Sequence, residues 1–247
     1  HAQPTNNMAD ALLIATVRGL EVLTIHGSLT VGAYDISGLT LTGENPVNTY
    51  LTVDASAATT NAHFKDLFLI NSVFDGSVYA DHCYLSNVSN IEGFVENSIV
   101  AGAIALSGGT MFFIDCKSGA IGLGSASTPV LDFAGLTDTK VVFRNWDGPV
   151  EIINSTHSGN SVVLNVGSAA HIKLGTTNTA GSVAIHGICS KDNTSAMIIE
   201  EATRLDQASI AASMLAAAQT TPIHSDAKKM NGATILGNGT SGDKWRG

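Results

Sequence analysis

Carboxyl side chains are the first groups in this sequence to consider for chemistry, since the chain contains 21 Asp and Glu residues. A glycosidase needs two of them, about 5–10 Å apart, on either side of a sugar cleft. Parallel strands lie about 5 Å apart, so acids about 20 residues apart could face each other on adjacent turns of a coiled β structure. Such pairs are Asp75 with Glu96, and Asp115 with Asp132 or Asp138. Most acids stand beside Gly or Asn, as turn residues do, and we expect turn or surface acids rather than a catalytic pair.

Histidine is the next candidate, as a metal ligand or a general base. The eight histidines show neither HxH nor HExxH spacing. His26 and His186 each stand between an alternating segment and a glycine, so we expect them at equivalent strand-to-turn positions. In Asp81-His82-Cys83, strand alternation would point His82 away from both neighbours. We therefore expect no metal site and no cofactor.

Signals for a nucleophile or a phosphate loop are weak. There is no GxSxG motif, although one sequence leaves open a Ser/His/Asp arrangement formed in space. The glycine-rich residues 119–124 (GAIGLG) lie between strands with no GKS or GKT after them, so a corner is expected there. Cys83, Cys116 and Cys189 are odd in number and far apart, which predicts small buried residues rather than disulfides or metal ligands. We assign no catalytic residue.

The elements that would position these residues are mostly short β segments. Apolar triplets with period-two alternation recur about every 10 residues in the later half, separated by clusters of Gly, Asn, Ser and Thr. Two triplets per turn give a rung of about 20 residues. This spacing predicts a parallel right-handed β-helix over residues 20–200, with an antiparallel β-sandwich as the alternative. The triplets are residues 121–123, 131–133, 141–143, 150–152, 162–164, 172–174 and 183–185.

A helical segment is expected before the β region. It covers Met8–Arg18 with Gly19 as its stop, and it belongs to an N-terminal docking segment, residues 1–19. Its apolar stripe is expected to comprise Leu12, Leu13, Val17 and Leu20. The chain begins with His1 rather than Met, and we expect it to be a piece of a longer polypeptide.

The C-terminal residues 201–247 are expected to form an Ala-rich helix followed by a Gly-rich docking tail. The helical pattern begins at Glu200, where negative charge suits a helix N-terminus, and it ends before Pro222. In the tail, the apolar run of residues 233–236 is expected to add one strand.

Composition and charge exclude several classes of protein. The net charge is −9 and no Lys/Arg cluster exists, which argues against nucleic acid as a partner. No apolar run reaches the roughly 18 residues of a membrane span, so no membrane insertion is expected. Charged residues make up only 13% of the chain, so its surface is expected to carry hydroxyls and amides instead.

Aromatic residues gather in the first half of the β region. We expect roughly two thirds of them to fill the core and the rest to form an intersubunit or receptor-binding surface. They are Phe64, Phe68, Phe74, Tyr79, Tyr84, Phe94, Phe112 and Phe113.

Residues 112–200 resemble a module of structural and tail proteins of tailed bacteriophages. The similar segments are FFIDCKSG, STPVLDFAGL, VVFRNWDGPVEIIN and AGSVAIHGICSKDN. The C-terminal residues 213–247 also resemble phage virion tails in which an Ala-rich helix leads into a TPIH-x-D-x-KKMN segment. The matching residues of the module include Phe113, Asp115, Cys116, Ser118, Pro129, Asp132, Phe133, Phe143, Arg144, Trp146, Gly148, Glu151, Ile152, Asn154, Asp192 and Asn193.

This resemblance covers about half of the chain and its motifs are structural. It implies a non-enzymatic β-helical component of a phage tail or baseplate, located in the virion and assembled in the bacterial host cytoplasm. The implied partners are two further copies in a homotrimer, other tail or baseplate proteins, and a bacterial surface receptor. A capsid decoration protein and a fragment of a polysaccharide-degrading tailspike are the alternatives.

Overall fold

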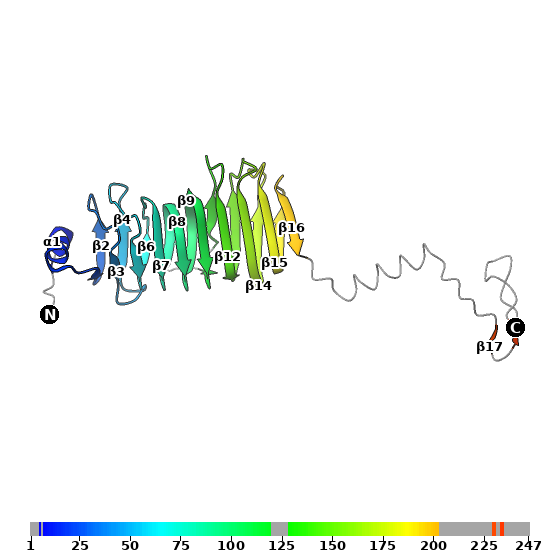
Figure 1. Cartoon of the computed structure of the whole chain (residues 1–247), viewed down its shortest axis with the longest axis horizontal. Coiled ribbons are helices and arrows are strands. Elements are labelled where there is room, and N and C mark those ends of the chain that lie inside the picture. The colour runs from blue at the N-terminus through cyan, green and yellow to red at the C-terminus, as the bar shows by residue number, and fades with distance from the viewer. Residues whose placement is uncertain (1–4, 6, 120–127, 203–228, 231–232, 235–247) are drawn as a thin grey trace. The chain divides into compact units, whose positions relative to one another are not determined.

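A parallel β-solenoid of about 9 turns forms the main body of this protein (Figure 1). The computed structural model describes residues 5, 7–119, 128–202, 229–230 and 233–234. The chain is mainly β, with 55% strand and 6% helix. The predicted β-helix is therefore confirmed, and the antiparallel sandwich is excluded. The chain divides into two units, His1–Ala202 and Thr203–Gly247, which are described separately.

The strands of the first unit stack into three parallel ladders, here called A, B and C. Ladder A contains β1 (Val22–Thr24), β3 (Thr40–Thr42), β5 (His63–Lys65), β7 (Ser77–Asp81), the ends of β8 (Tyr84–Glu96) and β9 (Ile99–Ile114), β12 (Lys140–Trp146), the starts of β14 (Ser161–Leu174) and β15 (Ser182–Asn193), and β16 (Ile198–Ala202). Ladder B contains β2 (Ser28–Val31), β4 (Tyr50–Val53), β6 (Phe68–Ile70), the starts of β8 and β9, and β10 (Lys117–Ser118). Ladder C contains the middle of β9, β11 (Val130–Asp132), β13 (Pro149–Ile153), and the ends of β14 and β15.

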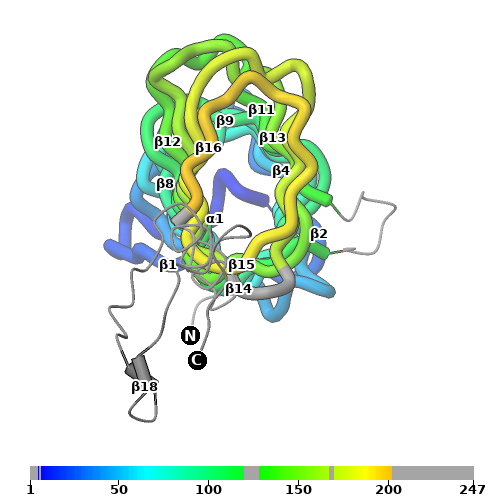
Figure 2. Tube along the Cα trace, turned by 90° about the vertical axis from the view of Figure 1, so that its right-hand side faces the viewer, coloured from blue at the N-terminus to red at the C-terminus, as the bar shows by residue number. Residues whose placement is uncertain are grey.

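The rungs superimpose as a closed ring when viewed along the solenoid (Figure 2). Their lengths vary because loops of different size leave the ring between the ladders. Successive partners in ladder A are only 15 residues apart at Tyr79 and Phe94, but 30 apart at Phe112 and Val142. Each ladder keeps its register despite this variation, so each side chain position is repeated on the next rung.

A narrow apolar core runs through the ring. Alternate residues of each strand point inward, and one inward column of ladder A passes through eight rungs with every member buried. Its aromatic part is the most tightly stacked, because the rings of Phe113 and Phe143 lie 5.2 Å apart and Trp146 contacts both edge-on. The column comprises Leu41, Phe64, Ala80, Val95, Phe113, Phe143, Leu164 and Ile185.

Helix α1 (Met8–Arg18) precedes the first rung, as predicted. The Asn7 side chain accepts a hydrogen bond from the Asp10 amide at its start, and Gly19 ends it in a left-handed conformation with φ 62°. The predicted apolar stripe is wrong, because the buried residues are Met8 and Ala15. Leu12 packs partly against the core, whereas the expected stripe residues Leu13, Val17 and Leu20 are exposed.

The C-terminal boundary of the β region differs from the prediction. Glu200 and Glu201, expected to begin a helix, belong to strand β16, which pairs with β15 through Ala202. The predicted body of that helix lies outside the described residues, as do the triplet 121–123 and all but the first residue of the glycine-rich segment 119–124. In the second unit, β17 (Lys229–Met230) and β18 (Ala233–Thr234) form an antiparallel pair, so the predicted strand begins at the expected residue.

Candidate functional site

Five consecutive rungs turn the corner from ladder A to ladder B in the same way. A residue in the left-handed region ends the ladder A strand, the next residue is buried, and the third begins the outer face of ladder B. Asn, Asp and His enter the left-handed region more readily than other non-glycine residues. This preference explains why the corner contains only these three types. With φ between 50° and 54°, they are Asp66, His82, Asn97, Asp115 and Asn145.

A groove of about 650 Å³ lies along four of these rungs and is here called the corner groove. Its lining comprises one left-handed residue on the first of these rungs and, on the next three rungs, the left-handed residue with the two residues that follow it. Because parallel strands are about 4.8 Å apart, the groove presents polar groups at a regular repeat along the solenoid. The lining residues are His82, Asn97, Ser98, Ile99, Asp115, Cys116, Lys117, Asn145, Trp146 and Asp147.

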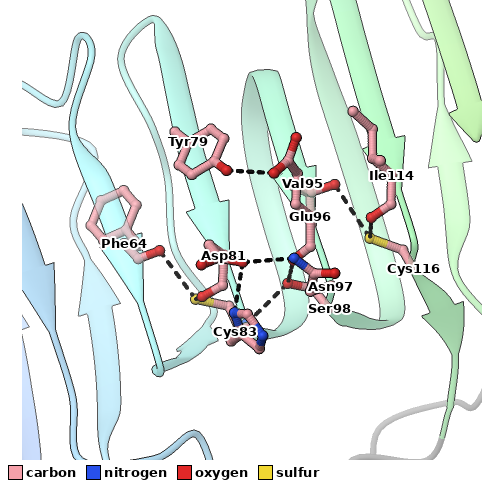
Figure 3. Close-up of polar contacts among 11 residues, drawn as sticks. Phe64, Tyr79, Asp81, Cys83, Val95, Glu96, Asn97, Ser98, Ile114 and Cys116 are labelled. Atoms are coloured by element: carbon pink, nitrogen blue, oxygen red, sulfur yellow. Dashed lines mark hydrogen bonds and ion pairs between the residues drawn. The ribbon is translucent and has the colours of Figure 1, made fainter.

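Hydrogen bonds between rungs hold the polar side chains of the corner groove in place. Asn97 Nδ2 donates to Asp81 Oδ1 at 3.0 Å (Figure 3). His82 Nδ1 lies 2.7 Å from the same carboxylate oxygen. Farther along the groove, Asn145 Nδ2 donates to Asp115 Oδ1 at 2.8 Å. These side chains are therefore oriented before any ligand is present, which lowers the entropy cost of binding.

The carboxyl group of Asp81 is held in its charged form by these contacts. Burial by itself raises its pKa, but the hydrogen bonds from Asn97 and His82 outweigh that effect and bring the pKa below its ordinary value. A glycosidase general acid needs the opposite shift, a pKa raised toward neutrality. Asp81 is therefore suited to accept hydrogen bonds and not to donate a proton.

Beneath the corner groove lies a column of buried small residues, with a thiol on alternate rungs. Cys83 Sγ donates to the carbonyl of Phe64, and Cys116 Sγ donates in the same way to the carbonyl of Val95 (Figure 3). Ser98 stands between them, and its hydroxyl accepts from the Cys83 amide at 2.9 Å. Burial raises the pKa of both thiols to about 12, so neither forms a thiolate near neutral pH.

The prediction of buried cysteines is thus confirmed for Cys83 and Cys116, and no disulfide joins them. Cys189 is only half-buried, on strand β15. Its pKa is raised too, again because burial disfavours the thiolate.

Four rings form a column on the outer face of ladder A, beside the corner. The ring centroids of His63 and Tyr79 are 4.4 Å apart, and those of Phe94 and Phe112 are 4.7 Å apart. Phe94 and Phe112 are nearly parallel, with an interplanar angle of 6°, so they cover each other's faces. The guanidinium of Arg144 lies 5.8 Å from the Phe112 centroid. Within the pair formed by Phe94 and Phe112, the facing ring surfaces are therefore covered.

Of the eight aromatic residues gathered in this half, four are buried and four are partly or fully exposed. The buried ones are Phe64, Phe68, Phe74 and Phe113, and the others are Tyr79, Tyr84, Phe94 and Phe112. The core thus takes fewer of them than predicted, because ladders A and B each carry aromatic residues on their outer faces.

The candidate acid pairs are not brought together. Asp75 lies in a turn, where its amide bonds the Thr59 hydroxyl, whereas Glu96 pairs in register with Asp81. Asp115 stands at the corner and Asp132 in ladder C, where it accepts from Asn154 at 2.8 Å. Asp138 is an exposed residue of the loop between β11 and β12.

Two expectations about histidine are wrong. His82 does not face away from Asp81, because it leaves the strand conformation at the corner and turns back to contact that carboxylate. His26 and His186 are not at equivalent positions, since the register of ladder A brings His186 into line with Thr24. His26 instead contacts Glu44 at 2.9 Å.

A Ser/His/Asp arrangement does form in space, on strands β14 and β15. His171 Nδ1 lies 2.8 Å from Ser190 Oγ, and His171 Nε2 lies 3.4 Å from Asp192 Oδ2. Ser190 and Asp192 are exposed, and neither lines the corner groove. These contacts are those expected of neighbouring side chains on paired strands, since His171 pairs in register with Ser190.

A second hollow, of about 770 Å³, lies between helix α1 and the first rungs. Its lining is largely apolar and includes Met8, Ile14, Leu23 and Leu29. Among the described residues, no group of three His, Cys, Asp or Glu side chains could hold a metal ion. Within the same ranges, no helix is long and apolar enough to cross a membrane.

Comparison with protein-family models, with curated proteins and with solved structures finds no match to this chain.

Proposed function

We propose that this protein is a non-enzymatic structural component of a bacteriophage tail or baseplate and belongs to the host-attachment apparatus. The observation that carries the proposal is the position of the phage-like motif residues in the fold. Phe113, Phe143 and Trp146 form the stacked aromatic part of the core. Asp132 and Asn154 join adjacent rungs by a side-chain hydrogen bond. The motifs therefore specify a stiff β-helix, which suits a load-bearing virion part.

The absence of enzymatic activity is part of the proposal and is supported by the state of the acids. The carboxylate of Asp81 is bound by Asn97 and His82, and Glu96 accepts from the Tyr79 hydroxyl at 2.5 Å. Both side chains are occupied within the fold. A glycosidase needs one carboxyl with a raised pKa, whereas the pKa of Asp81 is lowered.

Assembly as a homotrimer and docking to other tail proteins are further parts of the proposal. Helix α1 exposes Leu13 and Val17, whose side chains are 64% and 76% accessible. Phe94 on the outer face of ladder A is 41% accessible. Apolar groups of this size on the surface are typical of contacts with other proteins.

A reconstruction of the virion tests the proposed location. We expect density for the β-solenoid at the tail tip or baseplate, in three copies around each axis. Density on the head shell instead would replace this proposal by a capsid decoration protein. In solution, a stable monomer of about 25 kDa by light scattering would contradict the trimer.

Incubation with host capsule or lipopolysaccharide tests the tailspike alternative. We expect no release of reducing sugar. Release that stops in Asp115→Asn or Asp147→Asn, the two carboxylates that line the corner groove, while the fold is retained, would show a polysaccharide-degrading enzyme instead.

A further inference from the structure

We propose that the corner groove binds a neutral, hydroxyl-rich glycan chain laid along the solenoid axis. This inference rests on the proposed attachment function and names the class of receptor that the groove fits. The groove has a volume of about 650 Å³ and extends over four rungs, so it accommodates an elongated ligand. Repeated polar groups at the rung spacing suit a polymer made of repeated units.

The polar groups of the corner groove match the chemistry of sugar hydroxyls. A hydroxyl both donates and accepts hydrogen bonds, so it needs a mixture of partners. The amides of Asn97 and Asn145 offer both functions, the carboxylates of Asp115 and Asp147 accept, and Lys117 donates. Asn97 and Asn145 are each fixed by a hydrogen bond to a carboxylate, so their remaining donors and acceptors keep a defined direction.

The charge of the corner groove favours a neutral glycan over an acidic one. Asp115 and Asp147 line it and Asp81 lies directly behind His82, whereas Lys117 is the only Lys or Arg in the lining. Carboxylates therefore outnumber ammonium groups, and the whole chain carries a net charge of −9. A polyanion such as a uronic acid chain would be repelled.

The backbone at this corner leaves little for a peptide to bind. The backbone amides of the corner donate hydrogen bonds to carbonyl groups of adjacent rungs. The amide of Asn97 donates to Ile114, that of Asp115 to Arg144, and that of Asp147 to Cys116. A peptide strand that adds to a sheet needs such groups free. Trp146 is only 1% accessible, so it offers no open apolar pocket for an aromatic anchor. Side-chain hydrogen bonding to hydroxyls is the mode that remains.

Isothermal titration calorimetry tests the inference, because the heat of binding does not depend on the buried Trp146. The probes are maltohexaose, cellohexaose and chitohexaose as neutral glycans, and hexagalacturonate as an acidic glycan of equal length. We expect a saturable heat of binding with at least one neutral probe, and binding of hexagalacturonate weaker by about tenfold or more. No saturable heat with any neutral probe at millimolar concentration, or tighter binding of hexagalacturonate, overturns the proposal.

Variants within the groove make the test specific to this site. Lys117→Phe places a bulky ring over the groove. The double variant Asp115→Asn with Asp147→Asn weakens two hydrogen-bond acceptors, and asparagine tolerates the backbone conformation of the corner. We expect each change to weaken binding of the neutral probe by about fivefold or more. Asp138→Asn, a matched loss of charge in an exposed loop outside the groove, should leave it unchanged. Equal binding by the groove variants, with their circular dichroism unaltered, places the glycan elsewhere and overturns the inference.

Failure of this inference and failure of the proposed function give different results. A protein found at the tail tip that binds no neutral hexasaccharide keeps its attachment role and loses only the glycan groove. A protein found on the head shell loses the attachment role whatever the titration shows.

Discussion

The Tyr79 hydroxyl donates a hydrogen bond of 2.5 Å to the Glu96 carboxylate, although 17 residues separate them in sequence. They stand on neighbouring rungs of ladder A, where Tyr79 pairs with Phe94 and Glu96 with Asp81. The bond therefore runs diagonally across the outer face of the ladder (Figure 3). It joins the aromatic column to the row of acids that leads to the corner groove.

The hydrogen bond to Glu96, together with burial, raises the pKa of Tyr79 to about 12. Because the folded state binds this proton more tightly than the unfolded state, its stabilising effect is complete below a pH of about 10. It is lost as the pH rises from there through about 12. We expect urea denaturation to show a steeper loss of stability between pH 10 and pH 12 in the natural sequence than in Tyr79→Phe. Parallel loss in both proteins would contradict the shift.

The three cysteines should differ in their reaction with a thiol reagent. Cys83 and Cys116 are buried with pKa values raised to about 12, whereas Cys189 is half-buried. Since the thiolate is the reacting form, we expect one slow thiol per native chain and three after denaturation. A colorimetric thiol assay with Ellman's reagent measures this. The variant Cys189→Ser should show no reaction in the native state, and a remaining fast thiol there would contradict the burial of the other two.

The inner and outer aromatic columns of ladder A should contribute unequally to stability. Phe143 is fully buried between Phe113 and Trp146, so Phe143→Ala removes a core ring and should cost about 3–5 kcal/mol. Phe94 faces outward and is 41% accessible, so Phe94→Ala should cost about 1 kcal/mol. Chemical denaturation monitored by circular dichroism compares the two. Similar costs would mean that the outer column is covered, as in a trimer interface.

The sequence predicted the β-helix because strand alternation and small turn residues recur along most of the chain. It did not predict the corner groove, because its signal is a short pattern at irregular spacing. That pattern is a residue with left-handed backbone conformation, followed by a buried residue and then by a residue on the outer face of ladder B. It reads DLF at residues 66–68, HCY at 82–84, NSI at 97–99, DCK at 115–117 and NWD at 145–147.

Irregular spacing also keeps the candidate acid pairs apart. A constant rung of about 20 residues aligns Glu96 with Asp75. The actual rung is shorter by several residues, and the partner of Glu96 is Asp81. The turns between the ladders differ in length from rung to rung, because their sequences do not repeat. The register of the strands therefore follows from how the strands pack and not from a constant number of residues per rung. The sequence also does not predict which face of helix α1 is buried. Ala15 is buried and Val17 is exposed because of the way the helix packs against the first rungs, which its own residue pattern does not specify.

A left-handed position away from the groove allows the backbone argument to be tested on its own. Asn61 is exposed, has φ 59°, and its amide donates to the Ser77 carbonyl on the next rung. Asn61→Gly keeps access to this conformation, and we expect its stability to change by less than about 0.5 kcal/mol. Asn61→Ala introduces a residue that pays a steric penalty there, and we expect a loss of about 1 kcal/mol. Urea denaturation of both variants gives the comparison. If alanine is tolerated as well as glycine, left-handed strain does not explain why Asn, Asp and His recur at the corners.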